Sequence, residues 1–306
     1  MNLTYDAQPP TGAYAVRGVE PGHDVVEGWS VKLLPFEPKG VDLEFKQTLI
    51  QAIHHLSVAP GDALHAVYAS AIVGNWDAEN ILFYNVGSGP FGKLTQRGLS
   101  FERAYVAPPT APGALHPFRH YHRYWMSSHG DRFQYWDKAE TAARFEAEAI
   151  TNNAELSNAS SVWLRVKRGD TKILHNSAML DQDFGISITI RKPRDSKLSL
   201  ASVVKTVLDG VIAAFHAHNG AKLDDVSERL GAKLDITPTD AMYLLLDNRL
   251  NLFGTRNLVW PYKNGIQWNP ADDRCVAAEL LIDDTATESG WELSGELFAV
   301  RPRSAE

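Results

Sequence analysis

Strand-like and helical hydrophobic patterns follow one another in the same order twice along the chain. In the first half, an apolar segment at 29–36 precedes a segment at 42–56 whose apolar side chains recur every three or four residues. In the second half, alternating apolar residues at 186–190 precede a similar helical pattern at 200–215. Periods of 2 and 3.6 residues are typical of strands and of amphipathic helices. This order predicts an α/β or α+β fold in which mixed sheets carry helices on one face.

Short matching segments extend the similarity between the halves. Asp-Ala occurs at 77–78 and again at 240–241, and in both places an apolar stretch and then Phe-Gly follow. The matches indicate either a duplicated strand-helix-strand unit or chance similarity of short segments. A chain of 306 residues is long enough for two domains. The small polar segment 151–161 predicts a boundary between a first unit at 1–150, with an aromatic and histidine-rich extension, and a second unit at 161–306.

Six further segments have local patterns of their own. Residues 81–86 are apolar and predict a strand, whereas the alanine-rich segment 137–150 predicts a helix. Residues 162–166 and 171–174 alternate around Arg-Gly-Asp, which is typical of a β-hairpin. Alternation at 275–282 and at 291–300 predicts two closing strands.

Composition excludes several classes of protein. The single cysteine, Cys275, cannot form an internal disulfide or supply a structural zinc site. No apolar run approaches the roughly 18 residues of a membrane span, and residues 1–6 do not resemble a signal peptide, so a cytoplasmic protein is expected. A formal charge of −7 argues against a surface covered in phosphate-binding cations, although it permits a local basic patch.

The segment 116–136 is the densest in chemically active side chains. Its 21 residues hold four histidines, three arginines, one acid and seven aromatics. Aromatic faces stack on nucleobases and guanidinium groups bind phosphate, but the same residue types are enriched in protein interfaces. Together with a second aromatic and basic cluster, this segment predicts contacts with nucleic acid or with another protein subunit. The candidate contact residues are Arg119, Arg123, Tyr124, Trp125, Arg132, Trp136, Arg256, Trp260, Tyr262, Lys263 and Trp268.

A metal site is another interpretation of the same segment. On a strand, His120 and His122 would point to one face, where they could ligate a metal ion together with Asp131. Packing in a core or an interface would also explain these residues.

Carboxylates in the second half suggest a different metal-dependent chemistry. Lys205–Asp209, followed later by Asp272-Asp273 and Val276, resembles the RusA-type Holliday-junction resolvases over less than a tenth of the chain. Ser199, Ala201 and Ser202 stand where that family has acidic residues before the lysine, so the resemblance implies a lost site. Independently of this resemblance, carboxylates are the ligands that Mg²⁺ uses in two-metal phosphodiesterases. The candidate catalytic residues are Asp272, Asp273 and Glu279, with a divalent metal ion as the candidate cofactor.

Two functions therefore follow from the sequence. The first is an intracellular interaction or scaffold subunit of a larger assembly, which contacts other protein subunits and also nucleic acid through its aromatic and basic segments. The alternative is a metal-dependent phosphodiesterase or nuclease, or a catalytically degenerate relative of one. The enzyme predicts a divalent cation near Asp272 and Asp273, whereas the subunit predicts that its aromatics are covered by a partner.

Overall fold

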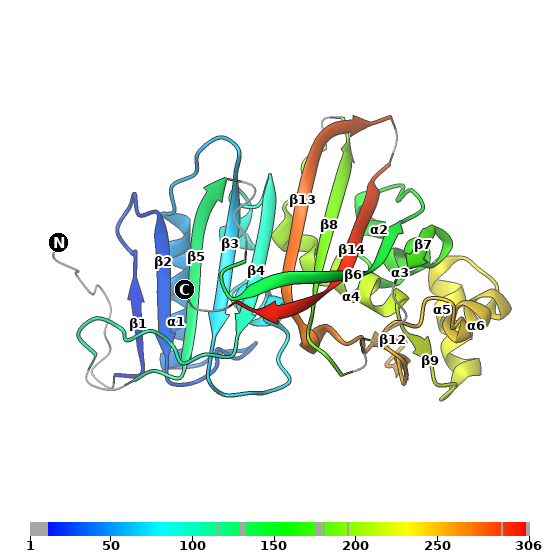
Figure 1. Cartoon of the computed structure of the whole chain (residues 1–306), viewed down its shortest axis with the longest axis horizontal. Helices are drawn as coiled ribbons and strands as arrows, with labels where there is room; N and C mark the ends of the chain where they lie inside the picture. Colours follow the sequence, from blue (N-terminus) through cyan, green and yellow to red (C-terminus); the bar gives the residue numbers. More distant parts are fainter. Residues whose placement is uncertain are drawn as a thin grey trace.

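Ten strands from both halves of the chain form one mixed sheet in the computed structural model (Figure 1). The structure describes residues 12–114, 117–128, 133–174, 179, 181–194, 196–288 and 290–303. The strand order is β1-β2-β5-β3-β4-β13-β8-β14-β6-β7, so β4 and β13 join the two halves. An α/β fold with a mixed sheet is thus confirmed.

The first half of the sheet comes from the N-terminal part of the chain. Its strands are β1 (Tyr14–Arg17), β2 (Val25–Ser30), β5 (His120–Ser128), β3 (Asp62–Ala69) and β4 (Gly98–Ala104). Helix α1 (Val41–His54) packs on this half through Phe45, Leu49 and Ile53, which confirms the predicted helix. Gly28 of β2 permits the close approach, because a Cβ atom there would lie 3.1–3.2 Å from the rings and methyl groups of Phe45 and Leu49.

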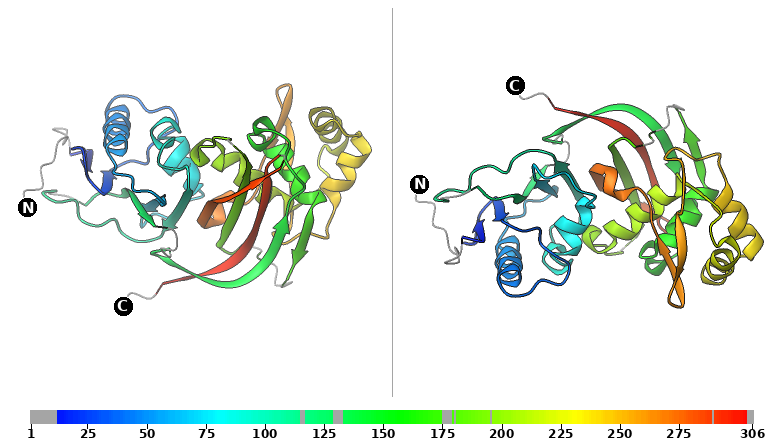
Figure 2. Two further views of the ribbon diagram at one scale, coloured as in Figure 1. Left: turned by 90° about the horizontal axis from the view of Figure 1, so that it is seen from above. Right: turned by 90° about the horizontal axis from the view of Figure 1, so that it is seen from below.

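The second half of the sheet contains β13 (Cys275–Thr287), β8 (Phe184–Pro193), β14 (Glu292–Pro302), β6 (Trp136–Glu146) and β7 (Asp170–Ile173). Helices α2 (Asn153–Leu156) and α3 (Ala159–Arg168) lie between β6 and β7 in the chain, and α4 (Leu200–Ala214) follows β8. Figure 2 shows α1 and α4 on the same side of the sheet. Buried side chains from Tyr14 to Leu297 form one continuous hydrophobic cluster, so the two halves share a core.

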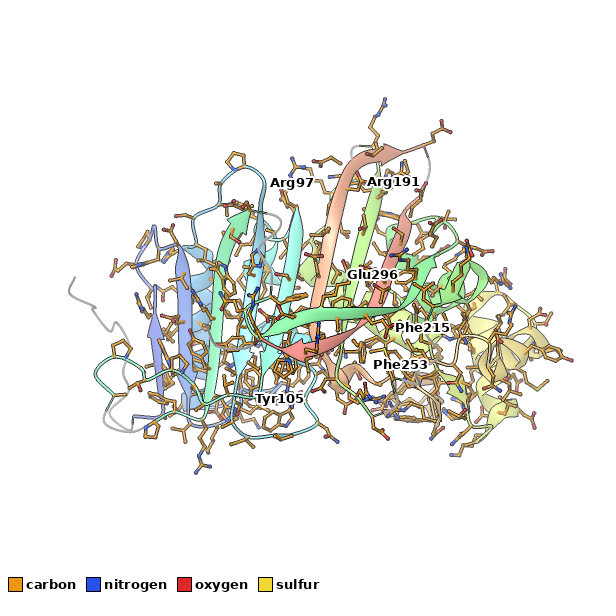
Figure 3. The ribbon with its side chains drawn as sticks, in the orientation of Figure 1. Arg97, Tyr105, Arg191, Phe215, Phe253 and Glu296 are labelled. Atoms are coloured by element: carbon orange, nitrogen blue, oxygen red, sulfur yellow. The ribbon has the colours of Figure 1, made fainter. Side chains whose placement is uncertain are left out.

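Smaller elements follow α4. They are α5 (Leu223–Leu234), α6 (Pro238–Leu246) and two short two-stranded sheets, β9 (Ala217–His218) with β10 (Thr255–Arg256) and β11 (Val259–Tyr262) with β12 (Gly265–Trp268). The backbone N–H of Phe253 donates to the carbonyl of Phe215 at 3.1 Å, which ties the chain before β10 to the end of α4 (Figure 3). Among the described residues, no helix is both long enough and apolar enough to cross a bilayer.

The topology does not show an internal duplication. In each half a helix connects two parallel strands, β2-α1-β3 and β8-α4-β13. However, β5 lies between β2 and β3, whereas β8 and β13 are direct neighbours. Strand β6, which the sequence placed in the first unit, pairs with β14 and β7 in the second half of the sheet.

Several predicted elements are correct and four are wrong. Of the strand-like segment at 29–36, only residues 29–30 lie in a strand, β2. The helix at 200–215 and the strands at 186–190, 275–282 and 291–300 are confirmed as α4, β8, β13 and β14. The predicted strand at 81–86 is instead the π-helix η1 (Asn80–Tyr84). The predicted helix at 137–150 is mostly β6, and the predicted strand at 162–166 lies in α3. Cys275 is a buried free thiol at the start of β13.

Candidate functional site

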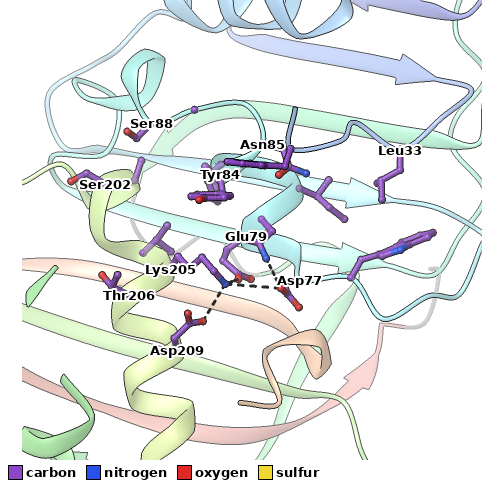
Figure 4. A pocket seen from close by; sticks show the side chains of 18 of the residues that line it. Leu33, Asp77, Glu79, Tyr84, Asn85, Ser88, Ser202, Lys205, Thr206 and Asp209 are labelled. Atoms are coloured by element: carbon purple, nitrogen blue, oxygen red, sulfur yellow. Dashed lines mark hydrogen bonds and ion pairs between the residues drawn. The ribbon is translucent and has the colours of Figure 1, made fainter. Parts of the chain in front are cut away.

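An acidic cluster surrounds one lysine where the two halves of the sheet meet. Lys205 and Asp209 lie one turn apart on α4, and Asp77 and Glu79 come from the segment that leads into η1 (Figure 4). Asp272 begins the short 3₁₀ helix η3 (Asp272–Arg274), which immediately precedes β13. Three segments that are far apart in the sequence thus supply the cluster.

Lys205 is within ion-pair distance of four carboxylates. Its Nζ atom lies 3.2 Å from Glu79, 3.3 Å from Asp209, 3.5 Å from Asp272 and 4.0 Å from Asp77. With all of these groups ionised, a single positive charge faces four negative ones. The cluster therefore has a surplus of negative charge that a cation would reduce.

Glu79 is the most buried member of the cluster. The residue is only 1% exposed, and one carboxylate oxygen, Oε1, contacts Lys205. The other oxygen, Oε2, is buried and has no hydrogen-bond partner among the described residues. The next residue, Asn80, donates its amide N–H to Asp77, and its buried Oδ1 atom likewise has no partner in the described part of the chain. Buried polar atoms are normally paired, so unpaired acceptors on two consecutive residues indicate a site for a missing donor or cation.

Burial and mutual repulsion shift the pKa values of the cluster. Burial, together with the neighbouring Asp272, raises the pKa of Asp77 to about 6. Burial likewise raises the pKa of Asp209 to about 7 and that of Glu79 well above its usual value. For Lys205, burial alone would lower the pKa, but the surrounding carboxylates, Glu79 foremost, outweigh it and raise the pKa. Lys205 consequently remains protonated at neutral pH and is not a nucleophile.

Three of the carboxylates have the spacing of a cation site. Ligand oxygens of Asp77, Glu79 and Asp272 all lie within 4.8 Å of one another. Two oxygens on opposite sides of a bound ion are about 4.2 Å apart for Mg²⁺ and about 4.8 Å apart for Ca²⁺. This is the only such group of three His, Cys, Asp or Glu side chains in the part of the chain that the structure describes.

A buried arginine fastens the loops that carry these ligands. Arg103 of β4 is 2% exposed and donates to the backbone carbonyls of Gly74, Trp76 and Asp273. Its guanidinium carbon also lies 5.7 Å from the centroid of the Trp76 ring. Arg103 thereby hydrogen-bonds both to the segment before Asp77 and to the segment that contains Asp272, and so fixes the two relative to each other.

Two pockets adjoin the cluster. The first, here called the Tyr84 pocket, has a volume of about 840 Å³ and is lined by both polar and apolar side chains, among them the aromatic Phe36 and Tyr84. The second, the Trp260 pocket, has a volume of about 620 Å³ and is lined by Arg256, Trp260 and Trp268 among others. Both pockets are bounded by the same five residues of the cluster and its surroundings: Asn75, Asp77, Asn80, Lys205 and Asp209.

The structure separates the three candidate catalytic carboxylates. Asp272 belongs to the cluster, and Asp273 lines the Trp260 pocket beside it. Glu279 lies further along β13, where its carboxylate accepts a hydrogen bond of 2.9 Å from Ser187 of β8. It is not one of the three grouped ligands.

The candidate histidine site lies elsewhere, on β5. Tyr68 and the Nδ1 atom of His120 are hydrogen-bonded at 2.7 Å, and the ring of His122 packs between those of Phe45 and Tyr68. Within the described part of the chain, neither ring nitrogen of the fully buried His122 has a hydrogen-bond partner. Asp131, the proposed third ligand, lies outside the described residues. The described surroundings of His122 are therefore those of a packed aromatic core.

Acid should destabilise the protein through its buried histidines. Burial lowers the pKa of His122 to about 3, whereas an unfolded histidine has a pKa near 6.5. The unfolded chain thus binds the proton first, and stability falls as the pH drops from 6.5 towards 3, by at most about 1.4 kcal/mol per pH unit for this group. We expect His122→Leu to flatten this dependence in urea denaturation between pH 7 and 4. The exposed His54→Leu serves as the control, and an unchanged slope in the His122 variant would contradict this account.

The candidate contact residues divide into exposed and buried groups. Arg119, Tyr262 and Lys263 are exposed, and the guanidinium carbon of Arg123 lies 4.7 Å from the ring centroid of Trp125. Arg256, Trp260 and Trp268 line the Trp260 pocket. Tyr124 and Trp136 are instead buried and donate to the backbone carbonyls of Leu82 and Arg103, so packing removes them from any surface. Arg132 lies outside the described residues. Binding of nucleic acid or of a partner subunit stays a prediction.

No family model, curated protein or solved structure matches the chain.

The sequence missed two of the grouped ligands. In the sequence, Asp77 stands out only through the match of 77–78 to 240–241. Glu79 lies just before an apolar segment whose pattern predicts a strand, so it has no signal of its own. The available signal was the spacing Asp-Ala-Glu at 77–79 directly before an apolar segment. Lys205 and Asp209 were identified, but nothing in the sequence indicates that they meet the segment at 77–79.

Proposed function

We propose that this protein binds a divalent cation through Asp77, Glu79 and Asp272 and uses it to hydrolyse a phosphate ester. The observation that carries the proposal is Glu79, a buried carboxylate with one oxygen on Lys205 and the other without a partner among the residues that the structure describes. A cluster that served only to hold a structural ion pair would be expected to satisfy both oxygens. A cation bound to three carboxylates would supply the missing contact and offset the surplus charge.

The remaining members of the cluster have suitable roles in such a reaction. A cation lowers the pKa of a bound water molecule and polarises phosphate oxygens. Asp209, which lies 3.3 Å from Lys205 and bounds both pockets, would accept the proton of such a water molecule. The water oxygen then bonds to phosphorus while the bond from phosphorus to the ester oxygen breaks. The departing alcohol takes a proton from solvent. Lys205, which keeps its charge, would neutralise the phosphate oxygens.

Cation binding tests the proposal directly. We expect Mg²⁺ and Mn²⁺ to bind the wild type in isothermal titration calorimetry, and Tb³⁺ to luminesce when it is excited through tryptophan, since Trp76 lines the adjacent pocket. Asp77→Asn and Asp272→Asn each remove a charged ligand and should weaken cation binding by at least tenfold. Even mutation of residues that only hydrogen-bond to metal ligands lowers metal affinity by roughly 10–100-fold. The same variants should lose cation-dependent release of 4-nitrophenol from bis(4-nitrophenyl) phosphate.

Asp224→Asn is the matched control. Asp224 is exposed in the first turn of α5, so this variant loses one negative charge without touching the cluster. It should bind cations as the wild type does. Wild-type protein that binds none of these cations at millimolar concentration, or cluster variants that bind as tightly as the control, would overturn the proposal.

A further inference from the structure

The candidate cation site lies between two pockets, not at the end of one. The Tyr84 pocket and the Trp260 pocket share Asp77, Lys205 and Asp209 as boundary residues. A phosphate held at this boundary can therefore carry a substituent on each side. A phosphate monoester would use only one pocket, whereas a phosphodiester would use both.

Two aromatic rings that line the Tyr84 pocket, those of Phe36 and Tyr84, are exposed. The rings of Phe36 and Tyr84 are stacked, with centroids 4.9 Å apart and an angle of 7° between their planes. They are 55% and 52% exposed, respectively, although both line the pocket. Tyr84 ends η1, the helix that follows Glu79, so its ring is placed by the same element that places a cation ligand. Exposed aromatic faces of this kind bind unpaired bases by stacking.

The Trp260 pocket has a second set of aromatic side chains together with the guanidinium group of Arg256. The indole N–H of Trp268 donates to Ser160 at 3.0 Å, and its ring lies 5.3 Å from that of Trp163, so Trp268 is a fixed platform. Trp260 and Arg256 line the same pocket. A guanidinium group beside aromatic rings is suited to a phosphate next to a stacked base.

Size and charge narrow the substrate class. The two volumes, about 840 Å³ and 620 Å³, fall in the range of pockets that hold single small molecules. Bases paired and stacked within a duplex would have to leave the helix to enter them. Among the described residues that line the two pockets, Lys205 and Arg256 are the basic ones. Without a bound cation, the carboxylates would repel the phosphate.

We propose that the substrate is a single-stranded polynucleotide whose internal phosphodiester lies at the cation site, with one nucleotide in the Tyr84 pocket and the next in the Trp260 pocket. This inference rests on the proposed function, since the cation brings the phosphate to the carboxylates. It makes three requirements on binding. The ligand needs nucleotides on both sides of a phosphate, it needs to be unpaired, and it needs the divalent cation.

Fluorescence anisotropy with fluorescein-labelled (dT)₆ and (rU)₆ tests these requirements. Ca²⁺ is the cation for these measurements because its flexible oxygen coordination does not demand the octahedral geometry of Mg²⁺. We expect binding in Ca²⁺, none in EDTA, at least tenfold weaker competition by dTMP than by unlabelled (dT)₆, and little binding of a (dT)₆·(dA)₆ duplex closed by a hairpin loop. The two labelled probes show whether the sugar matters.

Variants on opposite sides of the cluster test the two pockets separately. Tyr84→Ala and Trp260→Ala should each weaken (dT)₆ binding by roughly five- to a hundredfold, the range for loss of one stacked base. Tyr243→Ala is the control for both, because this tyrosine is 67% exposed and lines neither pocket. The control should bind as the wild type does.

Tb³⁺ luminescence on the same samples separates the two proposals. Loss of the Tb³⁺ signal in the wild type would overturn the proposed function. A normal signal with equal competition by dTMP and (dT)₆, or with either pocket variant binding like its control, would overturn the two-pocket inference alone. Tighter binding of the duplex than of (dT)₆ would also overturn it.

Discussion

Replacing Lys205 with methionine should lower the free energy of unfolding of the cation-free protein by about 3–5 kcal/mol at pH 8, the range for breaking a buried ion pair. The variant leaves four carboxylates close together with no positive charge among them, and Glu79 is 1% exposed. Part of the loss is recovered by proton uptake. Because burial raises the pKa values of Asp77 and Asp209, the folded state binds protons more tightly than the unfolded state does.

The sign of the pH dependence follows from these raised pKa values. Stability falls as the pH rises from the unfolded carboxyl pKa near 4 through the folded values of about 6 and 7. Removing Lys205 raises the folded values further, so the deficit of the variant should grow between pH 5 and pH 8. Urea denaturation at these two pH values, in EDTA and in Mg²⁺, measures the effect.

Added cation distinguishes a metal site from a structural ion pair. A cation at 100 times its dissociation constant stabilises the folded state by about 2.7 kcal/mol, so Mg²⁺ or Ca²⁺ should restore most of what Lys205→Met loses. Lys138→Met is the control, because Lys138 is exposed and its ion pair with Glu296 and its cation–π contact with Phe298 lie outside the cluster. It should change stability by less than about 1 kcal/mol. No gain in the stability of either the wild type or Lys205→Met on adding cation would mean that the cluster is purely structural.

Hydrophobic periodicity predicted the elements that lie against the core. Helix α4 buries Val204, Val207, Leu208 and Val211, and this spacing is visible in the sequence. Strand β6 was missed because Ala, Arg and Glu favour helix locally, yet its pairing with β14 from Trp136 to Glu146 prevails. In the same way Val162 and Trp163 were interpreted as a strand, although they form the buried face of α3. Local preference could not decide these segments, since the neighbouring strands that fix them are distant in sequence.

The candidate site was only half accessible to sequence reasoning. Asp272 is predicted from its residue type, whereas the Lys205–Asp209 segment stands out only through a short family resemblance; both belong to the cluster. Their meeting with Asp77 and Glu79 depends on β4 lying beside β13, which brings η1, α4 and η3 together. That pairing joins segments about 180 residues apart and leaves no local pattern. Conversely, the dense segment at 116–136 attracted attention through composition, yet Tyr124 and His122 serve the core.

Glu79→Gln should separate stability from cation binding. Burial, with Asp272, Asp77 and Asp209 nearby, raises the pKa of Glu79 well above its usual value, so the carboxylate is an unfavourable group in the cation-free protein. Glutamine has nearly the same shape, and its amide oxygen can still accept a hydrogen bond from Lys205. We therefore expect the cation-free variant to be at least as stable as the wild type at pH 7.5, because a charge has left a buried acidic cluster.

Added Mg²⁺ should make the wild type more stable than Glu79→Gln. Loss of one charged ligand should weaken binding by at least tenfold, and each tenfold loss removes about 1.4 kcal/mol of cation-induced stabilisation once the cation is in excess. Thermal unfolding across 0–20 mM Mg²⁺ would then show the wild-type Tm rising past that of Glu79→Gln. Glu279→Gln is the matched control, since its carboxylate pairs with Ser187 outside the cluster. If Tm rises in parallel with Mg²⁺ concentration for Glu79→Gln and the wild type, the buried carboxylate contributes only to packing. If the two Tm curves cross, the carboxylate destabilises the cation-free protein but contributes to cation binding.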